Sequence, residues 1–237
     1  KQMPAYLDCG KKLAETGEYE WAAFFDADEY LVLKKHEHVA DMLEEHCSRG
    51  ALVINWLVFE SNGWNLQAVE PVTRRFQYHL AWDNPVQNHV KSIVRLADVK
   101  ELAWKDPHNF ANMKEGSTVH DSNGKPVEGP FNTDNPRDVV VIHHYHTKSR
   151  KEYVAKKNRG RSDWIKDEEA ARETMNLVAE DLANSLAGED LPMDTKHFEE
   201  QGLVFDDSAW QFLKSHVPAY ALFDEIGLIK TNESRRK

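Results

Sequence analysis

Short apolar runs alternate with amphipathic segments along the first half of the chain. Residues 20–25, 51–59 and 138–142 are nearly continuous apolar runs, which predict strands buried on both faces, as in a parallel sheet. Residues 30–33 are predicted to be extended. A helix is predicted over 4–16 and a second over 37–48, with Val39, Met42, Leu43 and Cys47 facing inward and Gly50 closing it. This order of elements predicts an α/β fold.

The second half of the chain is more polar. Residues 89–95 alternate along a strand, and a hairpin is predicted to join 117–120 to 126–127. Ser149 is expected to cap a basic helix that runs to about residue 161. A further helix is predicted over 167–186, followed by a loop and two short helices over 190–230.

Composition narrows the functional classes. With 237 residues, the chain is long enough for one large α/β domain, or for one domain with a helical extension. It carries 30 Lys and Arg against 40 Asp and Glu, a formal net charge of −10. General nucleic-acid binding is therefore not expected, because that affinity comes mostly from cations on phosphates. An acidic protein can instead take phosphates through a divalent cation.

Cysteine content and hydropathy bear on location. Cys9 and Cys47 lack metal-site spacing, so no disulfide framework is expected, and a reducing, cytoplasmic compartment is the default. The sequence shows neither a transmembrane segment nor a signal peptide, although a chain that starts at Lys1 is expected to lack its true N-terminus. The basic helix from residue 150 could lie against anionic lipid as a peripheral contact, but a solvated basic face is favoured.

Metal-ligand residue types follow two of the predicted strands. Asp26, Asp28 and Glu29 come directly after the first apolar run, and His143, His144 and His146 end or follow the third. Carboxylates suit Mg²⁺ or Mn²⁺, and an added imidazole favours Mn²⁺. Such an ion would neutralise a diphosphate. The alternatives are a solvated acidic turn and a strand of structurally satisfied histidines.

Six short motifs occur in the order found in a known group of enzymes. The chain resembles GT-A type glycosyltransferases of the family 2-like and family 92-like group over residues 1–164, and residues 165–237 carry no usable resemblance. The motif residues are Trp21, Phe24, Phe25, Asp26, Asp28, Glu29, Tyr30 and Leu31; Trp56, Phe59, Ser61 and Gly63; Lys91, Ser92, Ile93, Val94 and Arg95; Pro107 and His108; Ile142, His144, Tyr145, Lys148, Ser149, Glu152 and Tyr153; and Arg159 and Gly160.

The resemblance implies a fold and a domain division. The fold would be GT-A-like and Rossmann-related, a mixed sheet with flanking helices. Residues 1–164 would form its metal and acceptor side, and residues 165–237 a C-terminal helical extension. The nucleoside-binding units of such enzymes would precede Lys1 and are expected to be missing from the sequence.

The resemblance also implies residue roles. Asp28 would ligate Mn²⁺ or Mg²⁺ directly, Asp26 would lie near the ribose or the metal, and His144 would be the later ligand. Lys91, Lys148 and Arg159 would offer positive charge to the diphosphate or the acceptor. His146 would be a bystander or would lie in the outer shell of the metal.

The group that removes a proton from the acceptor hydroxyl must be a carboxylate or a histidine within reach of it. Glu60, which stands where the family usually has glycine, and Asp163 rank first as this catalytic base. His108 and Asp121 rank below them. The sequence places none of these groups near a donor sugar.

The leading hypothesis is therefore an enzyme, a metal-dependent and inverting glycosyltransferase of the hexosyl- or deoxyhexosyltransferase type. It would move a sugar from a nucleotide-diphosphate donor, a UDP-sugar first, to a glycan or other hydroxyl acceptor. One alternative is a metal-dependent phosphoesterase or nucleotide hydrolase, which would hold two metals. The other is a non-catalytic carbohydrate-binding remnant.

Overall fold

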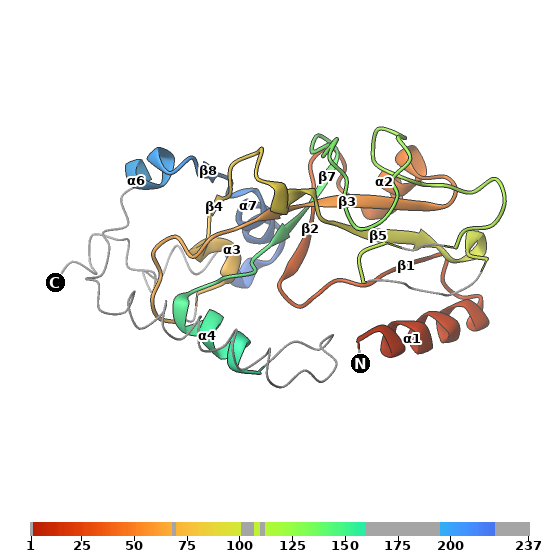
Figure 1. The fold of residues 1–237 in the computed structure, drawn as a ribbon, viewed down its shortest axis with the longest axis horizontal. Helices are drawn as coiled ribbons and strands as arrows, with labels where there is room; N and C mark the ends of the chain where they lie inside the picture. The colour runs from red at the N-terminus through yellow and green to blue at the C-terminus, as the bar shows by residue number, and fades with distance from the viewer. Residues whose placement is uncertain (1, 68–69, 101–106, 110–111, 160–194, 221–237) are drawn as a thin grey trace. The chain divides into compact units, whose positions relative to one another are not determined.

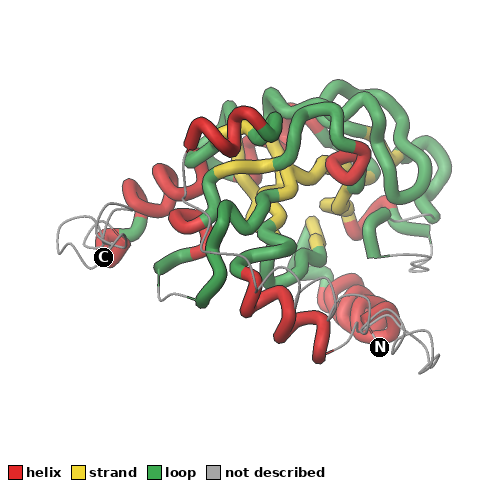
Figure 2. Tube along the Cα trace, turned by 60° about the vertical axis from the view of Figure 1, so that its left-hand side comes forward, coloured by secondary structure: helices red, strands yellow, loops and turns green. Residues whose placement is uncertain are grey.

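The protein is mixed α/β, with a curled sheet of parallel and antiparallel strands and flanking helices (Figure 1). This computed structural model describes residues 2–67, 70–100, 107–109, 112–159 and 195–220. Two compact units divide the chain: residues 1–58 with 82–144 form the first, and residues 59–81 with 145–237 form the second. Loops connect most of the short strands (green in Figure 2).

The first unit holds a six-stranded sheet in which β3 is central. The order is β1-β5-β3-β7-β2, with β6 pairing β3 as a short addition. β3 runs parallel to β7 and β6, and every other pairing is antiparallel. The strands are β1 (Trp21–Ala23), β2 (Glu29–Leu33), β3 (Ala51–Val58), β5 (Val90–Arg95), β6 (Val119–His120) and β7 (Val140–His144), and two 3₁₀ turns, η1 (Pro85–Asn88) and η2 (Leu96–Asp98), flank β5.

Two helices cover opposite faces of this sheet. α2 (Val39–His46) packs with a core that includes Leu52 and Ile54 of β3. Residues of α1 (Gln2–Thr16) pack instead against Ala51 and Val94. Successive strand residues point to opposite faces, so β3 needs apolar side chains on both, as its continuous hydrophobic run predicted.

The prediction that residues 20–25 form a strand buried on both faces of a parallel sheet was wrong. β1 has three residues, lies at the sheet edge, pairs antiparallel with β5 and leaves Ala23 exposed. Its neighbours are apolar because Phe24 packs into one core cluster and Trp21 and Phe25 into the other. The residues around this short edge strand are thus apolar because their side chains pack on both faces of the sheet.

Other predictions for the first unit mostly held. The buried runs over 51–59 and 138–142 became β3 and β7. The hairpin was confirmed in part, since His120 bridges Pro126 and β6 also pairs β3. Val39, expected inward, is 39% exposed, and α2 ends at His46, with Cys47 rather than Gly50 at its C-cap. Gly50 instead turns the chain into β3.

The second unit is built around aromatic side chains. Its elements are α3 (Val72–Arg75), β4 (Tyr78–His79), α4 (Arg150–Arg159), α6 (Thr195–Glu200), β8 (Val204–Phe205) and α7 (Ser208–His216). β4 pairs antiparallel with β8, and the buried rings are Phe59, Phe76, Tyr78, Tyr145, Phe198 and Trp210. The two short helices expected near the C-terminus are therefore confirmed as α6 and α7.

An ion pair connects α3 to the start of α4. Both terminal nitrogens of Arg75 donate to the Glu152 carboxylate, at 2.7 and 3.1 Å. Ser149 caps α4 as expected, because its hydroxyl accepts from the Glu152 amide while Glu152 accepts from the Ser149 amide. Burial alone would raise the pKa of Glu152, but the hydrogen bonds from Arg75 and Ser149 outweigh it and lower that pKa to about 2.

Several expectations lie outside the described residues. These are the helix over 167–186, the end of the basic helix beyond Arg159, and Asp163. The division at residue 164 stays a prediction. No helix in the described part of the chain combines the length and the apolar character that crossing a bilayer requires.

Gly50 provides a test of the turn into β3. Its φ is +86°, and a Cβ built there would lie 2.0 Å from the carbonyl oxygen of Thr118. We expect Gly50→Ala to lower the unfolding free energy by at least about 2 kcal/mol in urea titrations, because strain and a backbone clash add. Gly124→Ala, at φ +77° with no atom within 4 Å of the added carbon, should cost about 1 kcal/mol. Equal losses would contradict the close approach at Thr118.

Glu152 provides a pH test of the second unit. Its pKa is lowered on folding, so its stabilising contribution is complete above the unfolded value of 4.5 and is lost as pH falls toward 2. We expect Glu152→Gln to be less stable than the wild type by about 1–2 kcal/mol at pH 7, allowing for partial solvent exposure. This difference in unfolding free energy between the two proteins should disappear as the pH falls from 5 to 2. Glu128→Gln, on an exposed side chain, should show no such convergence.

Candidate functional site

The strand register gathers four polar or aromatic side chains on one face of the sheet. Residues 54, 56 and 58 of β3 share a face, Lys91 is the partner of Ile54, and His144 is the partner of Val58. Glu29 is in turn the partner of His144. Lys91, Trp56, His144 and Glu29 therefore come from four neighbouring strands and point to the same side.

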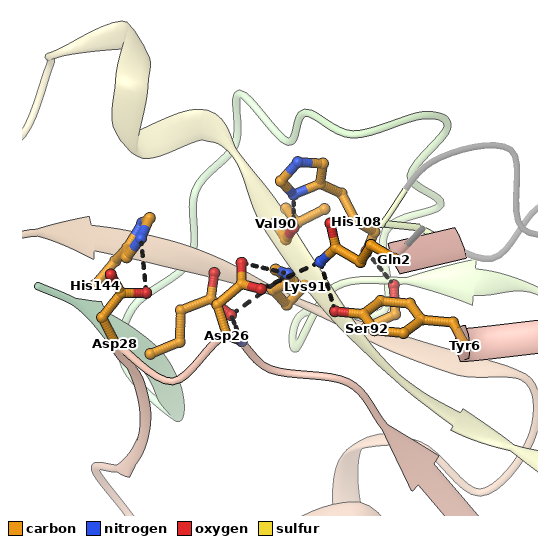
Figure 3. Close-up of polar contacts among 10 residues, drawn as sticks. Gln2, Tyr6, Asp26, Asp28, Val90, Lys91, Ser92, His108 and His144 are labelled. Carbon is orange, nitrogen blue, oxygen red and sulfur yellow. Dashed lines mark hydrogen bonds and ion pairs between the residues drawn. The ribbon is translucent and has the colours of Figure 1, made fainter. Parts of the chain in front are cut away.

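A tight turn before β2 adds two carboxylates to this face. The Glu29 amide donates to the Asp26 carbonyl at 3.0 Å, and the Asp26 amide donates to Glu29 Oε2 at 3.0 Å. These two hydrogen bonds hold residues 26–29 in a closed loop. The side chains of Asp26 and Asp28 both project from this loop, Asp28 toward His144 and Asp26 toward Lys91 (Figure 3).

Asp28 and His144 form the part of the site best suited to a metal ion. Asp28 Oδ1 lies 3.8 Å from His144 Nε2, and the two side chains are only 11% and 5% exposed (Figure 3). Two ligands of one octahedral ion, each about 2.1 Å from it, are separated by roughly 3 to 4.2 Å. The separation and the donor chemistry, one carboxylate and one imidazole, fit Mn²⁺.

Trp56 orients the His144 ring. The two ring centroids are 4.2 Å apart, and the other neighbours of the indole are His89, stacked at 4.8 Å, and His108, edge-on at 5.3 Å. Within the described residues, the buried Trp56 Nε1 has no hydrogen-bond partner. Sequence reasoning named Trp56 only as a motif residue, and its packing on His144 was not predicted.

Lys91 is the buried cation of the site. Its side chain is 1% exposed, and its Nζ lies 3.2 Å from Asp26 Oδ2 and 3.5 Å from Glu29 Oε2. Asp26 also accepts a hydrogen bond from Gln2 at 3.2 Å (Figure 3). The structure thus brings Lys91 to the acidic turn, a pairing with Asp26 and Glu29 that was not foreseen. The role of Lys91 toward a diphosphate or an acceptor stays a prediction.

Glu29 has the most perturbed carboxyl group here. Burial raises the pKa of Glu29 to about 7, and the nearby Lys91 ammonium and the Asp26 amide only partly oppose it. Its Oε1 has no hydrogen-bond partner in the part of the chain that the structure describes. Such a group is characteristic of functional sites. Sequence analysis included Glu29 in the acidic turn without a role, because its burial depends on the pairing of β2 with β7.

The other predicted site residues are not shown to join the pair of Asp28 and His144. Among the described residues, Asp26, Asp28 and His144 do not form a group whose ligand atoms all lie within 4.8 Å, so the metal role of Asp26 stays a prediction. Glu60 and Lys148 belong to the second unit. Burial raises the pKa of Glu60. Asp163 lies outside the described residues.

The two lower-ranked candidates for the catalytic base, Asp121 and His108, both make hydrogen bonds that support the fold. Asp121 is fully buried and accepts hydrogen bonds from the amides of Asn123 and Lys125, and from the side chain of Asn132. It stabilises a turn. The His108 ring contacts the Val90 carbonyl through Nδ1 at 3.0 Å and packs on Trp56.

Comparisons with models of known protein families and with curated proteins gave no match for this chain. The geometry of the site therefore carries the functional argument.

The buried ion pair of Lys91 predicts a stability effect. We expect Lys91→Met to lower the unfolding free energy by about 2–4 kcal/mol, because it leaves the Glu29 carboxyl group buried without its cation. The double variant Glu29→Gln/Lys91→Met should recover part of that loss. Lys11→Met, on an exposed lysine, should change stability by no more than about 0.5 kcal/mol. Denaturant titrations measure all three, and a Lys91→Met protein as stable as the wild type would contradict the pairing.

Proposed function

We propose that this chain is the metal-binding and acceptor-side part of a GT-A type glycosyltransferase that uses a nucleotide-sugar donor. The observation that carries the proposal is the buried pair of Asp28 and His144, whose ligand atoms are 3.8 Å apart. The motif resemblance over residues 1–164 supplies the reaction class.

The charge balance of the site supports a divalent cation. Three carboxyl groups, those of Asp26, Asp28 and Glu29, belong to this turn, and the buried Lys91 pairs with Asp26 and Glu29, so the cluster is acidic even with Glu29 protonated. Excess negative charge in a partly buried site favours a cation over a free anionic ligand. A diphosphate could then bind only together with a metal ion.

The residues of the chain have distinct roles in the proposed reaction. Asp28 and His144 hold the ion, Trp56 fixes the ring of His144, and Lys91 keeps the turn at 26–29 in place. When bound, Mn²⁺ would neutralise the phosphate oxygens of the departing nucleoside diphosphate. Lys148 would offer further charge to the diphosphate or the acceptor.

We assign Glu60 as the base that takes the proton of the acceptor hydroxyl in an inverting displacement. Burial raises the pKa of Glu60 above its ordinary value, which makes its carboxylate a better proton acceptor. Asp163 is the alternative base. Either assignment requires the transferred sugar to be attacked from the face opposite the nucleotide.

A two-metal phosphoesterase is less well supported. That chemistry needs two ions about 4 Å apart. In the part of the chain that the structure describes, the only cluster of three potential ligands with mutual distances under 4.8 Å is His36, Glu45 and His46. His36 follows the end of β2, whereas Asp28 precedes its start. The two candidate sites are therefore separated by the length of a strand.

Calorimetric titration of UDP into the full chain, with and without Mn²⁺, tests the proposal. We expect Mn²⁺-dependent binding that Asp28→Asn and His144→Ala each weaken at least about 10-fold. His146→Ala, the neighbouring histidine with no assigned ligand role, should bind as the wild type does. ADP and GDP titrated in parallel would reveal a different nucleotide preference.

Two results would count against the site. Binding that is indifferent to Mn²⁺ would remove the metal from the proposal. Binding that survives both substitutions would place the nucleotide elsewhere on the chain. If Mn²⁺-dependent binding is found, release of UDP from UDP-sugars with added glycan acceptors is the next assay, with Glu60→Gln as the variant expected to lose turnover while keeping UDP affinity.

A further inference from the structure

A second cluster of potential metal ligands lies at the other end of β2. His36 is in the connection between β2 and α2, while Glu45 and His46 occupy the last turn of α2. One ligand atom from each of the three side chains lies within 4.8 Å of the other two. We propose that His36, Glu45 and His46 form a binding site for a divalent transition-metal ion of the Zn²⁺ class. The inference is independent of the proposed glycosyl transfer.

The three side chains converge through the atoms that would bind a metal. His36 Nε2 lies 2.9 Å from Glu45 Oε2, and His46 Nε2 lies 3.5 Å from Glu45 Oε1. The two imidazole rings are nearly perpendicular, with centroids 5.4 Å apart. Ligands about 2.0–2.1 Å from a tetrahedral ion are separated by roughly 3.3 Å. Small side-chain movements would therefore admit the ion.

A backbone carbonyl fixes the orientation of His46. Its Nδ1 lies 3.1 Å from the carbonyl oxygen of Ser122, which can only accept a hydrogen bond. The Nδ1–H therefore donates, which leaves Nε2, the nitrogen that points toward Glu45, as the ring nitrogen that can coordinate an ion. Metal-ligating histidines usually hold their other ring nitrogen in this way.

Two side chains of the cluster are mostly buried and the third is exposed, so an ion bound there could be reached from solvent. The side chains of His36 and His46 are 11% and 17% exposed, whereas Glu45 is 67% exposed. Among the described residues, the buried His36 Nδ1 and His46 Nε2 atoms have no hydrogen-bond partner. A buried nitrogen without a hydrogen bond lowers the stability of the fold, and coordination of an ion by His46 Nε2 would remove that cost.

The donor set indicates the class of metal. Two imidazoles with one carboxylate suit Zn²⁺ and its neighbours Co²⁺, Ni²⁺ and Cu²⁺, whereas Mg²⁺ and Ca²⁺ prefer oxygen ligands. Three protein ligands leave one tetrahedral position for water on the exposed side. An ion there would connect the β2–α2 loop to α2, and through the His46 hydrogen bond to the loop at Ser122. We therefore expect it to stabilise the first unit.

Titration of the metal-free full chain with Zn²⁺ in competition with a chromophoric chelator tests the site. We expect one equivalent to bind, with at least a 10-fold loss of affinity in His36→Ala, His46→Ala and Glu45→Gln. His38→Ala and Glu44→Gln alter exposed neighbours of the same residue types and should bind as the wild type does. Glu45→Gln changes an exposed side chain, so it remains informative if a histidine variant fails to fold.

Two further measurements make the test specific. Co²⁺ bound at the site should give the visible absorption of a low-symmetry tetrahedral complex, which the three variants lose. Zn²⁺ should raise the unfolding temperature of the wild type and of Asp28→Asn, but not of Glu45→Gln. Absence of Zn²⁺ binding, or losses no larger in the variants than in the two controls, would overturn the inference. Neither result depends on whether UDP binds.

Discussion

The pairing of β3 with β5 along its first half and with β7 along its second half is the constraint on which the first unit depends. These backbone hydrogen bonds fix the register of Lys91 and of His144 relative to the same strand. A slip of one residue would move either side chain to the opposite face. The apolar side chains on both faces of β3, packed against α1 and α2, prevent such a slip because it would expose the cores.

The antiparallel pairing of β2 with β7 then determines where the acidic turn lies. β7 ends where β2 begins, so His144 is opposite Glu29 and next to the turn that carries Asp28. The usual α/β arrangement places ligands beyond the carboxyl ends of parallel strands. Here the two halves of the site come from the end of one strand and the start of its antiparallel neighbour. The buried Lys91 adds a positive charge to this turn through its ion pairs with Asp26 and Glu29.

β2 also separates two clusters of different chemistry. At its start are carboxylates with one imidazole, which suit Mn²⁺ or Mg²⁺, and beyond its end are two imidazoles with one carboxylate, which suit Zn²⁺. The first set lies among charged groups that could recognise a phosphate through a metal. The second set connects loops to a helix.

The sequence by itself determined the α/β class, the helices near 2–16, 39–46 and 150–159, the buried strands β3 and β7, and the capping of α4 by Ser149, because these depend on local periodicity and local hydrogen bonds. It also singled out Asp26, Asp28 and His144 as polar residues at strand ends, and Lys91 through the motif resemblance. Only the tertiary structure decided that β1 is an antiparallel edge strand, that Glu29 is buried with a raised pKa, and that Trp56 packs on His144. It alone brought His36 to Glu45 and His46. Those features depend on strand order and on packing between distant segments, which the spacing of residues along the chain does not encode.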